Sequence, residues 1–245
     1  SGKALYLSQC HGFNWYDSIQ GFTTQRGNLF DTVEDFHNPE GMNFFLSAYL
    51  ENAGGEVYSV RERDHHSDWD IVDDIDEVYT ETGTGFEDGS DGYLHQSQWG
   101  YGENPFEMGS TRRFPGGSAQ KASWTLTAPS TGYYAVYVSW AANTDSSDNA
   151  HYQLTWPGGQ IDRHFDQRVH GSTWQFFAKI PVREGDAVKI DLMGDTSTAS
   201  EWLSADAVRM GGGMSVISRK GELVGRPRWE ESAVLSTQYN GAPPS

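Results

Sequence analysis

The stretch YYAVYVSW, residues 133–140, is the clearest of several short apolar segments in the middle of the chain. Four similar segments accompany it: ASWTLT from Ala122, HYQLTW from His151, TWQFFAKI from Thr173 and VKIDL from Val188. Turn-forming residues separate them at 129–132, 143–148, 157–159 and 184–186. Short segments rich in aromatic and β-branched residues, with no helical period between them, predict an all-β sandwich.

A different pattern precedes this region. KALYLSQ, near the N-terminus, is typical of a strand, and EVYSVRERD from Glu56 is typical of a second one. Between them, Asn38 suits a helix N-cap and Pro39 the first helical position, while Gly54 followed by another glycine suits a helix end. Apolar residues lie at helical spacing on one face: Met42, Phe45, Leu46, Tyr49, Leu50 and Ala53. Strand, helix and strand with short connections predict a βαβ unit, and hence a parallel sheet.

Two changes of composition suggest domain boundaries. The stretch DDIDEVYTETGTGFEDGSDG, which begins at Asp73, is too polar for a core, and we expect it to form a boundary loop. Three glycines at 211–213 mark a second boundary, and the residues beyond them are too few to bury a core alone. We therefore predict an α/β domain with an incomplete parallel sheet, built from residues 1–72 and 213–245, and an all-β sandwich at 73–212 inserted into it.

The composition excludes several classes of partner. The chain of 245 residues carries 34 acidic and 17 basic side chains, for a net charge of −17. Such a chain repels phosphate backbones, so we expect no binding to nucleic acid. No stretch approaches the ~20 consecutive apolar residues of a membrane span. With one cysteine, the chain cannot form an internal disulfide.

The first predicted strand ends in Cys10, His11 and Gly12. Ligands bind at the carboxyl edge of parallel strands, so His11 is either a metal ligand or a turn residue bonded to the backbone. Glu34 lies in the loop ahead of the helix, from which a carboxylate can reach that edge. Glu40 lies in the first helical turn, where an acidic residue also interacts favourably with the helix dipole.

Four motifs of the N-terminal region resemble the opening of a zinc-dependent N-acetylmuramoyl-L-alanine amidase: ALYLSQCHG, TQRGN, VEDFHNPEGMNFFLSAYLENAG and VYSVRERD. The resemblance implies that His11 is the first zinc ligand and that a glutamate is the second. Counting back from Gly54 favours Glu34 for this position, and counting from the helix start gives Glu40 as the alternative. Cys10 departs from the family, which usually has glycine there.

The same resemblance implies a third zinc ligand and a general-base glutamate later in the chain. No motif for either occurs before Ser245, so we expect a C-terminal fragment of the same precursor to supply them. We expect the histidines outside the amidase-like motifs to be solvated or structural: His65, His66, His95, His151, His164 and His170. With zinc bound, the site would activate a water for attack on an amide.

The middle region is similar to the golvesin and xanthan-lyase carbohydrate-binding-like domain. Its motifs follow in order over residues 73–212, from KASWTLTAPSTGYYAVYVSWAAN to SADAVRM. We expect Asp206 and Arg209 of the last motif to have a structural role. Sugar rings stack on flat aromatic side chains, and we name four candidates for this role: Trp99, Tyr101, Trp156 and Trp174.

Two functions follow from these resemblances. The first is a secreted, zinc-dependent amidase that cleaves the muramoyl-L-alanine bond of peptidoglycan and carries a glycan-binding insert. The second is a non-catalytic extracellular protein on the same scaffold, which binds a polysaccharide or takes part in surface assembly. Both place the chain outside the cell or in the cell envelope.

Overall fold

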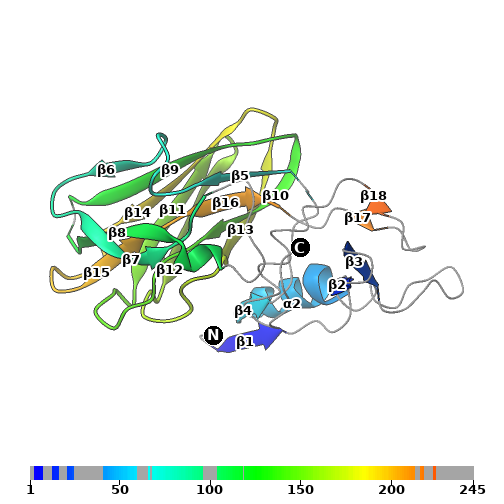
Figure 1. Ribbon diagram of the computed structural model, residues 1–245, viewed down its shortest axis with the longest axis horizontal. Helices are drawn as coiled ribbons and strands as arrows, with labels where there is room; N and C mark the ends of the chain where they lie inside the picture. The colour runs from blue at the N-terminus through cyan, green and yellow to red at the C-terminus, as the bar shows by residue number, and fades with distance from the viewer. Residues whose placement is uncertain are drawn as a thin grey trace, which may run out of the picture. The chain divides into compact units, whose positions relative to one another are not determined.

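The computed structural model describes residues 3–7, 13–16, 21–24, 41–59, 66, 68–95, 104–117, 119–212, 216–217 and 223–224 (Figure 1). The chain divides into two compact units. The first unit consists of residues 1–68, 98–103 and 211–245, and the second, called here the sandwich unit, of residues 69–97 and 104–210. The domain limits predicted at 72 and 212 stay predictions.

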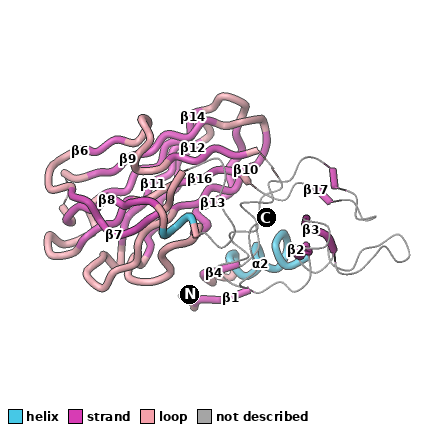
Figure 2. Tube along the Cα trace, viewed as in Figure 1, coloured by secondary structure: helices cyan, strands magenta, loops and turns pink. Residues whose placement is uncertain are grey.

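Two sheets of the sandwich unit form its main layers (Figure 1). The four-stranded sheet has the order β13-β10-β16-β5, with bounds Gln175–Val182, Gly132–Val138, Val208–Gly211 and Trp69–Val72. The five-stranded sheet has the order β12-β11-β14-β9-β6, with bounds Gly159–Phe165, Ala150–Trp156, Ala187–Met193, Lys121–Thr127 and Thr80–Thr82. Figure 2 shows that strands dominate this unit.

Alternation along the strands explains why these sheets pack face to face. In β11, Ala150, Tyr152 and Leu154 are fully buried, and the residues between them are half-buried. The core combines such residues from both sheets, including Trp124 of β9 and Tyr134 of β10. The all-β sandwich predicted from the five apolar segments is confirmed, because each segment overlaps one of its strands.

A three-stranded sheet completes the sandwich unit, with the order β15-β8-β7 and bounds Trp202–Ala205, Gly109–Pro115 and Glu87–Gly92. A short helix, η2 (Pro105–Glu107), precedes β8. The prediction of a boundary loop from Asp73 onward is corrected, because that stretch contains β6 of the five-stranded sheet and β7 of this one. Asp73 itself is buried, and its carboxylate accepts hydrogen bonds from the backbone N–H groups of Asp74 and His95 at 2.8 and 2.9 Å.

The first unit contains a parallel pair, β1 (Ala4–Leu7) with β4 (Glu56–Ser59). A helical segment lies between them in sequence, with π-helical turns at η1 (Gly41–Leu46) followed by α2 (Ser47–Asn52). It ends at Gly54, which has a φ of 85°, as the glycine pattern predicted. Two short antiparallel pairs are also described, β2 (Phe13–Tyr16) with β3 (Gly21–Thr24) and β17 (Val216–Ile217) with β18 (Leu223–Val224).

The helical face predicted to be apolar is largely exposed in the first unit. Phe45 and Tyr49 are 60% and 69% exposed, although their spacing is that of a buried helix face. Helical spacing sets which residues share a face, and a partner surface is needed to bury it. One parallel pair among the described residues does not establish the α/β domain, which stays a prediction.

Candidate functional site

Two hollows in the sandwich unit are candidate binding sites. The first, called the Tyr133 groove, is lined by Tyr133, Pro157, Gly158, Pro181, Arg183 and Asp186, among others, and has a volume of about 500 Å³. The second, called the Arg113 notch, is lined by Ser90, Arg113, Asn143, Asp145, Trp202 and Ser204, among others, and has a volume of about 70 Å³. Pockets that hold small ligands usually measure about 300–1,000 Å³, so the groove has the size of a ligand site and the notch does not.

Strand pairing and two turns build the Tyr133 groove. Tyr133 of β10 lies directly opposite Pro181 of β13, which brings the start of one strand beside the end of the other. Beyond β13, the backbone N–H of Arg183 donates to the Asp186 carboxylate at 2.8 Å, and this hydrogen bond closes the turn that leads to β14. The turn between β11 and β12 contributes Gly158 from the other sheet.

Tyr133 presents an aromatic ring to solvent in this groove. Its side chain is 64% exposed, and it is the one exposed aromatic residue among the described residues of the sandwich unit. The next residue, Tyr134, points to the core and is fully buried. A flat ring with a hydroxyl at its edge offers both an apolar face and a hydrogen-bonding group to a ligand.

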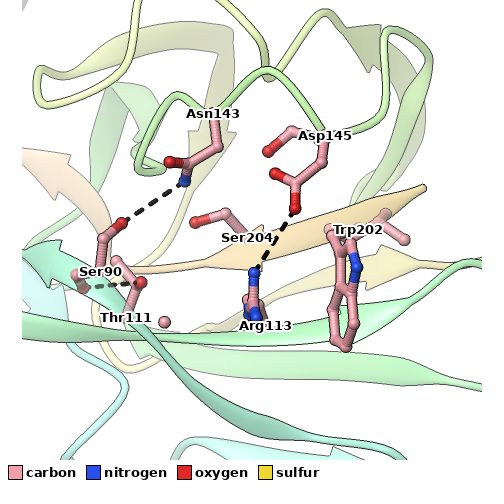
Figure 3. A pocket seen from close by; sticks show the side chains of 10 residues that line it. Ser90, Thr111, Arg113, Asn143, Asp145, Trp202 and Ser204 are labelled. Carbon is pink, nitrogen blue, oxygen red and sulfur yellow. Dashed lines mark hydrogen bonds and ion pairs between the residues drawn. The ribbon is translucent and has the colours of Figure 1, made fainter. Parts of the chain in front are cut away.

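Several of the polar side chains that line the Arg113 notch interact with one another (Figure 3). Arg113 Nε donates to Glu87 at 2.9 Å, and an Nη atom lies 3.6 Å from the Asp145 carboxylate. The guanidinium carbon stacks 4.3 Å above the Trp202 ring. The Asn143 amide donates to Ser90 Oγ at 3.5 Å. With its cation paired and its indole covered on one face, the notch has the features of a structural contact.

A buried carboxylate group lies between the sheets. Asp206 is fully buried and accepts hydrogen bonds from the Tyr93 backbone N–H at 2.8 Å and from Ser139 Oγ at 2.6 Å. Burial raises the pKa of Asp206 to about 7, against the lowering effect of these two hydrogen bonds. Burial, together with the carboxylates of Asp73 and Asp206, raises the pKa of Asp74 to about 8. The structural role predicted for Asp206 is confirmed by these bonds.

A second polar cluster centres on His151 of β11. Its Nδ1 lies 2.9 Å from Asp195, its Nε2 lies 3.0 Å from Asp162, and its ring stacks on His164 at 4.7 Å. Burial lowers the pKa of His151, but the hydrogen bonds to Asp195 and Asp162 outweigh it and raise that pKa overall. The cluster ties β11 to β12 and to the residues after β14, which is the structural role predicted for this histidine.

The aromatic residues predicted to bind sugar differ in how far they are buried. Trp174 is 8% exposed and packs on Tyr93 and Phe106 at 4.9 and 5.2 Å, so the prediction that it contacts a glycan is corrected by its burial. Trp156 is half-buried, and its Nε1 lies 2.4 Å from the place where a Cβ on Gly158 would be. It therefore packs against the turn that lines the Tyr133 groove.

Trp99 and Tyr101 lie outside the described residues. Tyr133 was missed by our sequence reasoning, which favoured tryptophans. The signal that points to it is the strand alternation: in the stretch from Tyr133, the first tyrosine and Tyr134 must face opposite sides of the sheet.

The predicted zinc ligands His11, Glu34 and Glu40 also lie outside the described residues. Within the part of the chain that the structure describes, no three His, Cys, Asp or Glu side chains are grouped so that they could hold a metal ion. The described helices include none that is long and apolar enough to cross a membrane.

Many solved structures are similar to this chain, and three of low identity illustrate the likeness. A xanthan lyase from Paenibacillus is 22% identical with a TM-score of 0.49, over 59% of this chain and 13% of the lyase. A family 35 carbohydrate binding module from Clostridium thermocellum is 14% identical (TM-score 0.39, 58% and 97% of the two chains), and CBM35 from Cellvibrio japonicus Abf62 is 15% identical (TM-score 0.35, 64% and 100%). At these values the likenesses carry no argument about ligands.

No curated protein matches the chain by sequence. A protein family does match it: the Golvesin C-terminal domain aligns with residues 81–212. The match begins in β6 and ends just after β16, and therefore covers most of the sandwich unit together with the SADAVRM motif. Because it covers more than half of the 245 residues, the chain belongs to the Golvesin C-terminal domain family.

Proposed function

We propose that the sandwich unit is a carbohydrate-binding module and that the Tyr133 groove holds the glycan. The observation that carries this proposal is the exposed ring of Tyr133 in a groove of about 500 Å³. Aromatic side chains are mostly buried in sandwich cores, and an exposed ring gains hydrophobic free energy when a ligand covers it. The apolar face of a sugar ring, with hydroxyls around its edge, matches such a surface.

The groove supplies polar groups of the kind that orient a sugar. Arg183 and Asp186 line the groove together with Tyr133, and Gly158 lines it from the turn between β11 and β12. A few polar groups around an apolar surface are typical of small-molecule sites. A polysaccharide partner also agrees with an extracellular or cell-envelope location, which is part of this proposal.

The test is binding of the full chain to a panel of soluble neutral polysaccharides, measured by affinity electrophoresis and calorimetry. Tyr133→Ala is expected to weaken binding at least tenfold, since truncating a central aromatic anchor usually costs about 2 kcal/mol or more and about 1.4 kcal/mol is tenfold. Tyr49→Ala is the matched control, because Tyr49 is similarly exposed but belongs to the first unit. Equal binding by the two variants would rule out the groove.

For the first unit we propose the zinc-dependent, amidase-like function that its motifs imply, with peptidoglycan as substrate and a C-terminal fragment of the precursor completing the site. The parallel pairing of Leu5 with Val57 across a helical segment favours it, because this is the connection of a βαβ unit. Metal analysis of the chain together with its downstream part is the test. One bound zinc, lost in His11→Ala, is expected, and a metal-free protein would contradict the proposal.

A further inference from the structure

We infer that the Tyr133 groove selects an anionic glycan, one that carries a carboxylate or sulfate group, and that Arg183 is the residue that selects it. The inference rests on the proposed glycan-binding function and names the ligand class of that site. The shared chemistry of the ligand is a negatively charged oxygen group on or beside a sugar ring.

The partners of the cationic side chains carry this inference. In the described residues of the sandwich unit, most lysines and arginines contact carboxylates. Arg112 pairs with Glu81 and Asp88, and Arg168 with Asp148 and Asp166. Arg163 donates to backbone carbonyl groups, at 2.7 Å to Phe177. This extensive pairing agrees with an acid-to-base ratio of two to one in the chain.

Arg183 differs from these residues. Its backbone N–H and C=O are bonded within its turn, but among the described residues no carboxylate or carbonyl group binds its guanidinium. The side chain is exposed and lines the groove beside Tyr133. In a chain with a net charge of −17, an arginine left without a carboxylate partner in a groove is available to an external anion.

Geometry favours an anion at this position. A guanidinium binds a carboxylate or sulfate through two parallel N–H groups, which fixes the orientation of the anion as well as its position. The nearest acidic group in the groove, Asp186, already accepts the Arg183 backbone N–H at 2.8 Å. A sugar stacked on Tyr133 would thus present a substituent to Arg183 without displacing an existing ion pair.

The experiment uses the full chain and two matched pairs of polymers. Carboxymethylcellulose is compared with hydroxyethylcellulose, and dextran sulfate with dextran, so that each pair shares a backbone and differs in charge. Binding to at least one anionic polymer is expected to be about 10–100-fold tighter than to its neutral partner, the range of one charge-assisted hydrogen-bonded contact. Which pair shows the preference distinguishes carboxylate from sulfate.

The variants separate the roles of the two residues. Arg183→Gln is expected to abolish the preference, so that the two members of a polymer pair bind with similar affinity, while Arg183→Lys restores part of the preference. Tyr133→Ala is expected to weaken binding to both. Lys189→Gln, which removes one positive charge from β14, is the control for net charge and should keep the preference.

Two results would overturn the inference. If the wild-type chain bound both members of each pair equally, or if Arg183→Gln kept the full preference, the anion selectivity would be wrong while the glycan-binding function stood. If neither member of either pair nor any polymer of the neutral panel bound, the proposed function would fail, and the inference with it.

Discussion

Asp206 shows how one carboxyl group can organise the interior of this sandwich. It joins Tyr93, which follows β7, to Ser139, which follows β10, and its own backbone carbonyl accepts a hydrogen bond from Trp124 Nε1 at 3.0 Å. A buried polar group that binds several chain segments specifies their register, because any shift leaves a donor without an acceptor. The aspartate of the SADAVRM motif therefore has a structural role, which is to fix the register of the segments that it binds.

The raised pKa of Asp206 gives a prediction about stability. The folded chain holds a proton on this carboxyl up to about pH 7, whereas the unfolded chain loses it near pH 4. Its contribution is therefore complete below about pH 4 and is lost as the pH rises through about 7. We expect Asp206→Asn, which keeps an acceptor for Tyr93 and gains a donor for Ser139, to reduce the loss of unfolding free energy between pH 5 and pH 8.

Urea unfolding at the two pH values measures this effect. Asp206→Ala is the comparison, because it leaves the buried Tyr93 N–H without an acceptor and should cost about 1–3 kcal/mol at either pH. The prediction fails if the wild-type chain and Asp206→Asn lose the same free energy of unfolding between pH 5 and pH 8.

Strands β7 and β8 pass each other at a pair of glycines, and this pair sets their spacing. Gly92 lies opposite Gly109, and a Cβ on Gly109 would fall 1.8 Å from the Tyr93 carbonyl oxygen. Because the obstacle is backbone, the strands would have to separate. That separation would also pull Tyr93 away from Asp206. The pairing of β7 with β8 therefore depends on the absence of a side chain at Gly109.

We expect Gly109→Ala to destabilise the chain at the upper end of the about 1–3 kcal/mol typical of overpacking. Gly185→Ala is the control. Its site has a φ of 82° but nothing within 4 Å of the added Cβ, so its cost is the backbone term of about 1 kcal/mol. Chemical denaturation of both variants gives the comparison, and a Gly109→Ala variant as stable as Gly185→Ala would show that the strands have room.

At the level of elements, alternation predicted some strands and could not predict others. The segments that begin near Ala122 and Tyr133 have apolar residues at every second position on the core side, so their pattern was sufficient. β7, with the sequence EDGSDG, has no apolar side chain. Its glycines allow it to lie close to β8, and ion pairs such as that of Arg113 with Glu87 join the two strands. Both features depend on the neighbouring strand, so the sequence of β7 alone does not reveal them.

The candidate site was less predictable than the fold for a related reason. Whether an aromatic ring is buried or exposed depends on which other residues pack against it. The local sequence around the ring does not show those residues. Trp174 is covered by Tyr93 and Phe106, which come from distant parts of the chain, while the side chain of Tyr133 is 64% exposed. The groove also needs Arg183, which lies some fifty residues further along the chain.

For the whole molecule, the titrating groups together make the folded chain most stable at mildly acidic pH. Asp206, Asp74 and His151 all have raised pKa values, so each loses its stabilising contribution as the pH rises. Asp162 has its pKa lowered to about 2 by hydrogen bonds from Gln153 and other side chains, so its contribution is lost as the pH falls below about 4. The net charge of −17 adds repulsion near neutrality.

We therefore expect the thermal midpoint to be highest between about pH 4 and pH 6.5 and to fall toward pH 8. Differential scanning calorimetry across this range is the measurement. Repeating it in about 0.5 M NaCl separates the causes, because salt screens the surface repulsion and leaves the buried carboxyls unaffected. A midpoint that rises steadily from pH 5 to pH 8 would contradict the expectation.

The position of β5 has a consequence for where this domain begins. The family match starts at residue 81, but β5, at Trp69–Val72, is the outer strand of the four-stranded sheet beside β16. A fragment cut at the start of the match would lose this strand and expose the backbone N–H and C=O groups of β16 along a free edge. Such edges pair with other chains, so the twelve residues before the match protect the domain from self-association and aggregation.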